Sequence, residues 1–274
     1  MYRILSRIGK LNNLSSIARD IRTDIIRMSY EAQSAHMGGS LSCVELLTAL
    51  YFSCMNIDPK KPDDPDSDKF IFSKAHDAKA LYATLCKRGY FSPDLLKGYE
   101  KNNGKLPGHA TRHCVPGVEI SAGSLGHGLP MAVGMAFAAK MNSNKKRIFC
   151  MISDGECDEG TTWEAALFAG HHKLDNLTLI IDYNKLQGFG TTKDILDIEP
   201  LSSKWQSFNW TARNINGHTF DEIIEAVNKP SGKDKPMVII ARTIKGKDGP
   251  EQHVNSVSSQ YKPPTTEEYE KYIR

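Results

Sequence analysis

The sequence has no long apolar run and no paired-cysteine motif, and each absence removes a class of protein. No segment approaches the roughly 20 apolar residues that a membrane span needs. The first ten residues, MYRILSRIGK, lack the apolar core and cleavage site of an export signal. The six cysteines stand at irregular spacings without a C-x-x-C pair, which indicates reduced thiols rather than a disulfide framework or a zinc site. These features predict a cytoplasmic protein that does not enter a membrane.

The chain also lacks a strong excess of charge of either sign. It has 35 basic and 32 acidic residues among 274, which gives a net charge of +3 with neutral histidines. This charge is too small and too evenly spread to predict nucleic-acid binding, although it would not repel a phosphorylated small molecule. The hydrophobic fraction of 40% is ordinary and is enough for one large core.

The first part of the chain predicts two helices separated by a break. Apolar residues recur at three- and four-residue steps over residues 14–35, which predicts an amphipathic helix. The glycines within residues 36–39 predict the break. Ser42 and Glu45 match a capping box, which predicts that a second helix covers about residues 42–55.

Further along, short apolar runs alternate with helical patterns. Strands are expected at 69–72, 147–152, 177–183, 210–213 and 237–243, and helices at 76–88, 126–141, 161–173 and 220–228. Strands that are apolar throughout and flanked by helices predict an α/β fold, a parallel sheet with helices on both faces. The Gly- and Pro-rich stretch 102–124 predicts a long loop, which in a compact domain is usually functional or mobile.

Polar residues follow two of the expected strands. Asp154-Gly155 ends one strand, and Asn184 ends the next one about 30 residues later, which is the length of a β-α-β crossover. A right-handed crossover brings both strand ends to one edge of the sheet, where ligands bind in open parallel sheets. Carboxylate and amide oxygens there suit Mg²⁺. The alternative is an ordinary turn, because Asp-Gly and Asn are both common at strand ends.

The residues at these strand ends resemble the thiamine-diphosphate fingerprint, which usually begins Gly-Asp-Gly and ends in Asn. The stretch from Gly155 to Gly190 resembles transketolases in particular. Four further blocks resemble the same family in the same order: SAHMGG at 34–39, SKAH at 73–76, PGH at 107–109, and PGVE with AGSLGHG at 116–128. The resemblance covers about residues 12–250. It implies a thiamine-diphosphate-binding (PP-type) domain at 1–250, followed by a C-terminal tail and short helix at 251–274.

The resemblance also implies roles for particular residues. Mg²⁺ would be held by Asp154, Asn184 and the carbonyl of Leu186. The cofactor would be bound by His76, Gly123, Ser124, Leu125, Asp154, Gly155, Glu156 and Asn184. Catalytic roles would fall to His36, His109 and His76, since histidine exchanges protons near neutral pH. Glu159 and Glu164 match acids that in relatives lie near the subunit interface and couple paired active sites. The remaining histidines, His113, His127, His171, His172 and His218, are interpreted as surface or structural residues.

The chain departs from the family pattern at several positions. Ser153, Ala75 and Met37 stand where relatives usually have Gly, Gly and Pro. Relatives place a further active-site histidine after the segment that corresponds to residues 245–247. His253 is a candidate for it, although Gln260-Tyr261 stands where an alignment would want that histidine.

The largest departure is length, because the pyrimidine-binding half of a full transketolase is missing. The chain is therefore expected to act only with a second subunit that carries the pyrimidine-binding and C-terminal domains, as a heterotetramer. It would transfer a two-carbon ketol unit from a ketose phosphate to an aldose. Two alternatives remain open: a half-subunit of another thiamine-diphosphate enzyme, such as a 2-oxoacid dehydrogenase or a deoxyxylulose-phosphate synthase, and a non-catalytic scaffold.

Overall fold

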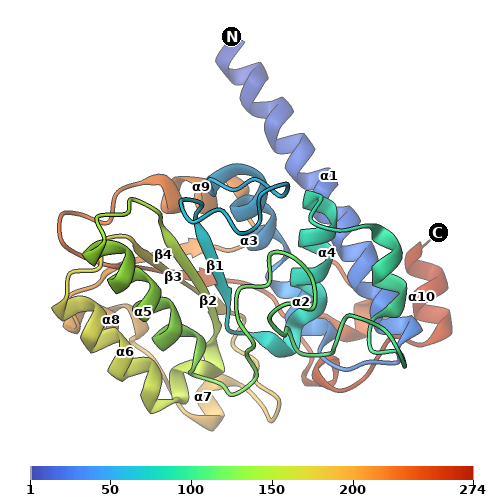
Figure 1. The fold of residues 1–274 in the computed structure, drawn as a ribbon. Helices are drawn as coiled ribbons and strands as arrows, with labels where there is room; N and C mark the ends of the chain where they lie inside the picture. The colour runs from blue at the N-terminus through green and yellow to red at the C-terminus, as the bar shows by residue number, and fades with distance from the viewer. Residues whose placement is uncertain (1, 274) are drawn as a thin grey trace.

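A five-stranded parallel sheet forms the centre of the molecule (Figure 1). The computed structural model describes residues 2–273 and, among them, the side chains from residue 11 onward. The strands are β1 Lys69–Phe72, β2 Ile148–Ser153, β3 Leu177–Tyr183, β4 Thr211–Asn216 and β5 Met237–Arg242, in the spatial order β1-β2-β3-β5-β4. All pairings are parallel, which confirms the expected fold class.

Helices cover both faces of this sheet (Figure 1). The described helices are α1 Tyr2–Glu31, α2 Met37–Ser42, α3 Val44–Ala49, α4 Ala78–Arg88, α5 Gly128–Met141, α6 Gly160–His171, α7 Thr192–Ile195, α8 Leu201–Ser207, α9 Phe220–Asn228 and α10 Thr266–Ile273. None of the helices within residues 2–273 is long and apolar enough to cross a bilayer.

Successive residues of each strand point to opposite faces, which divides the core into two layers. In β2, Phe149 and Met151 pack in the layer made with α1–α4 and α9. Ile148, Cys150 and Ile152 pack in the layer made with α5, α6 and α8. A strand that is buried on both sides is apolar at most positions, which is the pattern that predicted these strands. None of the six cysteines, all of which lie within the described residues, forms a disulfide, and five of them are buried.

The structure differs from expectation between α1 and α3. α1 ends at Glu31 and α2 begins at Met37, so the expected break exists, but it lies at residues 32–36 and the glycines Gly38 and Gly39 are inside α2. A β-carbon on Gly38 would collide with the side chain of Ser259, so the glycines permit close packing rather than ending a helix. The predicted capping box is also wrong. Ser42 donates a hydrogen bond to Asp182 at 2.5 Å, and Glu45 pairs with Arg22 and His218.

The register of the sheet brings the polar strand ends together. Ser153 at the end of β2 pairs with Asp182 near the end of β3. Asp154 and Asn184 therefore leave the sheet at the same edge, as the crossover spacing predicted. The loops after β1 and β5 reach the same edge, because every strand runs in the same direction.

Candidate functional site

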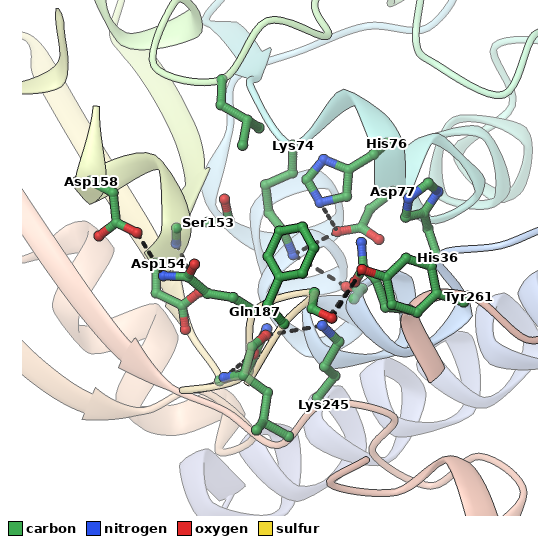
Figure 2. A pocket seen from close by; sticks show the side chains of 18 of the residues that line it. His36, Lys74, His76, Asp77, Ser153, Asp154, Asp158, Gln187, Lys245 and Tyr261 are labelled. Carbon is green, nitrogen blue, oxygen red and sulfur yellow. Dashed lines mark hydrogen bonds and ion pairs between the residues drawn. The ribbon is translucent and has the colours of Figure 1, made fainter. Parts of the chain in front are cut away.

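A cavity of about 450 Å³ lies at this carboxyl edge of the sheet (Figure 2). Its lining comes from the segments that follow β1, β2, β3 and β5, from the start of α2, and from residues 260–261 near the C-terminal end of the described chain. Such an edge is where open parallel sheets bind ligands. Segments far apart in the sequence thus line one pocket, because the parallel strands that precede them all end at the same edge of the sheet.

One wall of the pocket carries the proposed metal ligands. Asp154 is 2% exposed, and it accepts a hydrogen bond from the Lys185 backbone N–H at 2.7 Å. Burial, reinforced by the nearby carboxylate of Asp182, raises the pKa of Asp154 to about 6. Asn184 and Leu186 line the same wall. A buried carboxylate with a raised pKa gains from a neighbouring cation, so this wall suits a metal ion.

Two buried lysines place positive charge in the pocket. Lys74 forms an ion pair with Asp182 and lies 3.1 Å from Asp77. Burial opposes its charge, but these two carboxylates hold the pKa of Lys74 well above its usual value. Lys245 donates to the Leu186 carbonyl at 2.9 Å and to the side chain of Gln260 at 2.8 Å.

The chemistry of these groups fits a magnesium-bound diphosphate. Asp154, Asn184 and the Leu186 carbonyl are the hard oxygen donors that Mg²⁺ prefers. A cationic group, Lys245, already lies against the Leu186 carbonyl. Lys74 and Lys245 are donors suited to phosphate oxygens. Within residues 2–273, no group of three or more His, Cys, Asp or Glu side chains offers a different metal site.

Three histidines gather opposite this wall. The ring of His36 lies 5.3 Å from that of His76 and 6.0 Å from that of His109, measured between centroids. His36 and His76 line the cavity, and His109 lies beside them in an exposed position. Burial lowers the pKa of His36 to about 4, so its ring is neutral at neutral pH. His36 also adopts a left-handed backbone with φ of 65°, an uncommon conformation for a residue with a side chain.

The other expected cofactor-binding residues divide into two groups. Gly123, Leu125 and Gly155 line the pocket, whereas Ser124 and Glu156 are not part of its lining. The carboxylate of Glu156 accepts hydrogen bonds from the Ser73 hydroxyl and from the backbone N–H groups of Gly126 and Ser153. In this structure the Glu156 carboxylate joins the loops beside the pocket, and its contact with the cofactor stays a prediction.

His253 does not reach the pocket. It is 4% exposed, and its Nε2 lies 3.4 Å from Glu268 on α10. Gln260 and Tyr261 line the pocket in its place, and the Tyr261 hydroxyl donates to the Gly188 carbonyl at 2.9 Å. The two residues that an alignment would place at the histidine position are therefore the ones that the fold brings to the site.

The two acids expected at a subunit interface are exposed in the single chain. Glu159 lies at the rim of the pocket, and Glu164 lies on the surface of α6. The same helix exposes Leu167 and Phe168. Their role in coupling two active sites stays a prediction.

Comparison with known proteins decides the family. Residues 12–265 match the family described as "Transketolase, thiamine diphosphate binding domain". The chain belongs to the transketolase family. Membership confirms the class of enzyme that the motifs predicted, a transketolase-type transferase, and its thiamine-diphosphate-binding half.

Transketolase relatives of two lengths match the chain. It is 43% identical over 236 residues to an apulose-4-phosphate transketolase subunit of Actinobacillus succinogenes, covering 86% of each chain. It is 46% identical over 213 residues to a 6-deoxy-6-sulfo-D-fructose transketolase subunit of Clostridium sp., covering 77% of this chain and 78% of the relative. The solved transketolase from Leishmania mexicana superposes with a TM-score of 0.88 at 26% identity, over 95% of this chain and 41% of that one. The chain therefore spans about two fifths of the solved transketolase.

Sequence reasoning missed several residues of this transketolase pocket. Lys74, Asp77, Gln187 and Lys245 all line it, but the motifs gave them no role. A signal was available, because Lys74 and Lys245 each follow an apolar strand within three residues. The strand-end rule that selected Asp154 would have selected both lysines.

Proposed function

We propose that the chain is the diphosphate-binding subunit of a two-component transketolase, which transfers a two-carbon ketol unit from a ketose phosphate to an aldose. The observation that carries this proposal is the pocket wall of Asp154, Asn184 and Leu186, with Lys74 and Lys245 beside it. This wall belongs to a chain as long as relatives named as transketolase subunits. The second subunit would supply the pyrimidine-binding and C-terminal domains, in a heterotetramer.

Asp154, Asn184 and the Leu186 carbonyl would hold Mg²⁺ in the assembled enzyme. Lys245, which bonds to that carbonyl, would exchange it for a diphosphate oxygen. Thiamine diphosphate, when bound, supplies the carbanion chemistry of ketol transfer. The chain's own part is to orient the diphosphate and, through His36, His76 and His109, to exchange protons with the sugar.

Several finer assignments belong to the same proposal. The boundary near residue 250 separates the domain from a tail that returns Gln260 and Tyr261 to the pocket. Glu159 and Glu164 would lie at the interface between paired sites. The expected cytoplasmic location remains a prediction from the reduced thiols.

The experiment that tests the function is reconstitution. The chain is co-expressed with the partner that co-purifies with it and is assayed with thiamine diphosphate, Mg²⁺, and a panel of ketose phosphate donors and aldose acceptors. Ketol transfer that requires both subunits supports the proposal. Decarboxylation of pyruvate without ketol transfer would assign the chain to another thiamine-diphosphate enzyme, and bound cofactor without turnover would make it a scaffold.

A further inference from the structure

Lys79 is a fully buried cation on α4 whose hydrogen bonds go to neutral groups. Its side chain is 0% exposed, and its Nζ donates to the Ser34 hydroxyl at 3.0 Å and to the Ala35 carbonyl. Burial lowers the pKa of Lys79 to about 8, so most of the side chain is still charged at neutral pH. A buried charge is costly, and a methionine would fill a similar space without that cost. Packing alone therefore does not account for a lysine at this position.

The carbonyl that Lys79 holds belongs to the peptide bond between Ala35 and His36. A peptide unit is planar, so the Ala35 carbonyl and the His36 N–H turn together. The His36 N–H donates to the Gln260 carbonyl at 2.9 Å, and no backbone N–H of the described residues donates to the Ala35 carbonyl. Lys79 therefore holds one end of this peptide plane, and the C-terminal tail holds the other.

The held peptide maintains the left-handed backbone of His36. A φ of 65° is unfavourable for a residue with a β-carbon, and such a conformation persists only where the surroundings hold it. On the other side of the His36 Cα, the Ser40 hydroxyl donates to the His36 carbonyl at 2.8 Å. The backbone atoms N, Cα and C set the direction of the β-carbon. Fixing the groups on both sides of Cα therefore aims the imidazole ring.

We propose that Lys79 is a positioning residue for His36, which holds the preceding peptide from α4 and so keeps the imidazole aimed into the pocket. An ammonium group suits this task because it has three donors and also interacts with an aromatic face. Two of the donors serve Ala35 and Ser34, and the Tyr99 ring lies 5.5 Å from Nζ. The role of His36 toward a sugar rests on the proposed function, but the hold on its backbone does not.

The first measurement is a crystal structure of the unaltered full chain, which requires neither ligand nor activity. The expected result is Lys79 Nζ within about 3.2 Å of the Ala35 carbonyl oxygen, with His36 at a positive φ. A distance beyond about 3.5 Å, or a negative φ at His36, would overturn the proposal without any variant. This measurement decides the matter even where a substitution at Lys79 prevents folding.

The second measurement is the structure of Lys79→Met, which keeps the length of the side chain and removes its donors. Without Lys79, the strained backbone of His36 is expected to relax, and the ring should move by about 1 Å or more from its place beside His76. Lys87→Met is the matched control, because it makes the same replacement on α4 at an exposed lysine that pairs with Asp20. It should leave the His36 ring in place. An unmoved ring in Lys79→Met would refute the positioning role.

A double-mutant cycle in the reconstituted enzyme supplies the functional readout. Lys79→Met is expected to lower kcat/KM for the ketose phosphate about tenfold, because a misplaced group loses its alignment with the substrate. In enzyme that already carries His36→Ala, the same change should cost less than about twofold, since Lys79 would then have no histidine to position.

The outcomes of the cycle separate a positioning role from a general structural one. Equal losses in both backgrounds would show that Lys79 does not act through His36 and would contradict the proposal. Lys87→Met should change kcat/KM less than about twofold in either background. Absence of ketol transfer in the unaltered enzyme would refute the proposed function instead, and it would leave the two structural measurements of the His36 backbone standing.

Discussion

Replacement of Asp154 by asparagine should raise the unfolding free energy of the cofactor-free chain and, at the same time, abolish cofactor binding. Asp154 is buried, and its pKa is raised from 3.8 to about 6 in the folded chain. Since the folded-state pKa lies above the unfolded one, the fold disfavours the charged form, and stability falls as the pH rises from about 4 to about 6. Above pH 6 this amounts to about 3 kcal/mol of unfolding free energy.

Asparagine cannot ionise and therefore escapes this cost. It keeps one of the two oxygens that accept the backbone N–H groups of Gly155 and Lys185, and loss of the other costs about 1 kcal/mol. The net gain for Asp154→Asn is then about 1–2 kcal/mol, or roughly 2–6 °C in Tm. The measurement is thermal unfolding of the cofactor-free chain at pH 8.

The matched control is Asp68→Asn. Asp68 is also buried, but it pairs with Arg147 at 2.7 Å, so its loss should lower stability by about 1–3 kcal/mol. In the assembled enzyme, Mg²⁺ and thiamine diphosphate at 100 times Kd should add about 2.7 kcal/mol to the unaltered protein and nothing to Asp154→Asn. A lower Tm for cofactor-free Asp154→Asn, or a retained ligand-induced shift, would refute the reasoning.

Three further predictions test the surroundings of the site. Lys245→Met should raise the Kd for thiamine diphosphate by about 10–100-fold, measured by calorimetry on the assembled enzyme, because it removes the cation that would move from the Leu186 carbonyl to a diphosphate oxygen; an unchanged Kd would contradict this role. Gly39→Ala should lower the unfolding free energy by about 1–3 kcal/mol in urea titrations, because its methyl would meet the Asp77 oxygens. The same change at Gly134 in α5 meets no atom within 4 Å and should raise stability by about 0.5–1 kcal/mol; equal effects at both glycines would exclude the packing explanation. The folded-state pKa of His36 is lowered to about 4, so the free energy of unfolding should fall as the pH drops from about 6.5 towards 4. The expected loss is about 1–2 kcal/mol after allowance for the partial exposure of the ring. His36→Asn should remove this pH dependence from the free energies measured in urea titrations.

The strands and the wall of proposed metal ligands were predictable because both depend on local signals. A strand buried on both faces is apolar at most positions, and parallel strands bring their carboxyl ends to one edge. Asp154 and Asn184 could therefore be placed together from spacing alone, and the sheet register agrees.

Side-chain orientation depends on packing, which the sequence does not display. The sequence predicted that Gly38 and Gly39 end a helix, but both lie inside α2. Glycine is needed there because Ser259 and Asp77 occupy the space that a side chain would take. Glu156 follows Asp154 closely and yet turns to Ser73. Contacts between residues far apart in the sequence decide these cases.

The same limit applies to the histidines and their partners. Nothing in the sequence shows that the Asp77 carboxylate is fully buried, with Lys74 and His76 beside it; only the fold places these side chains together. His253 was the nearest histidine to an expected position, but the chain turns it to Glu268 and brings Tyr261 to the pocket. The presence of the expected type of residue near an expected position does not determine the direction in which its side chain points.

The most direct test of the proposed function is where a divalent cation binds. Crystals of the assembled enzyme grown with thiamine diphosphate and Mn²⁺, in place of Mg²⁺, would reveal the metal by its anomalous scattering. We predict a peak within about 2.3 Å of an Asp154 carboxylate oxygen, the Asn184 amide oxygen and the Leu186 carbonyl oxygen, with diphosphate completing its coordination. A metal peak at the diphosphate that none of these three oxygens reaches would contradict the account.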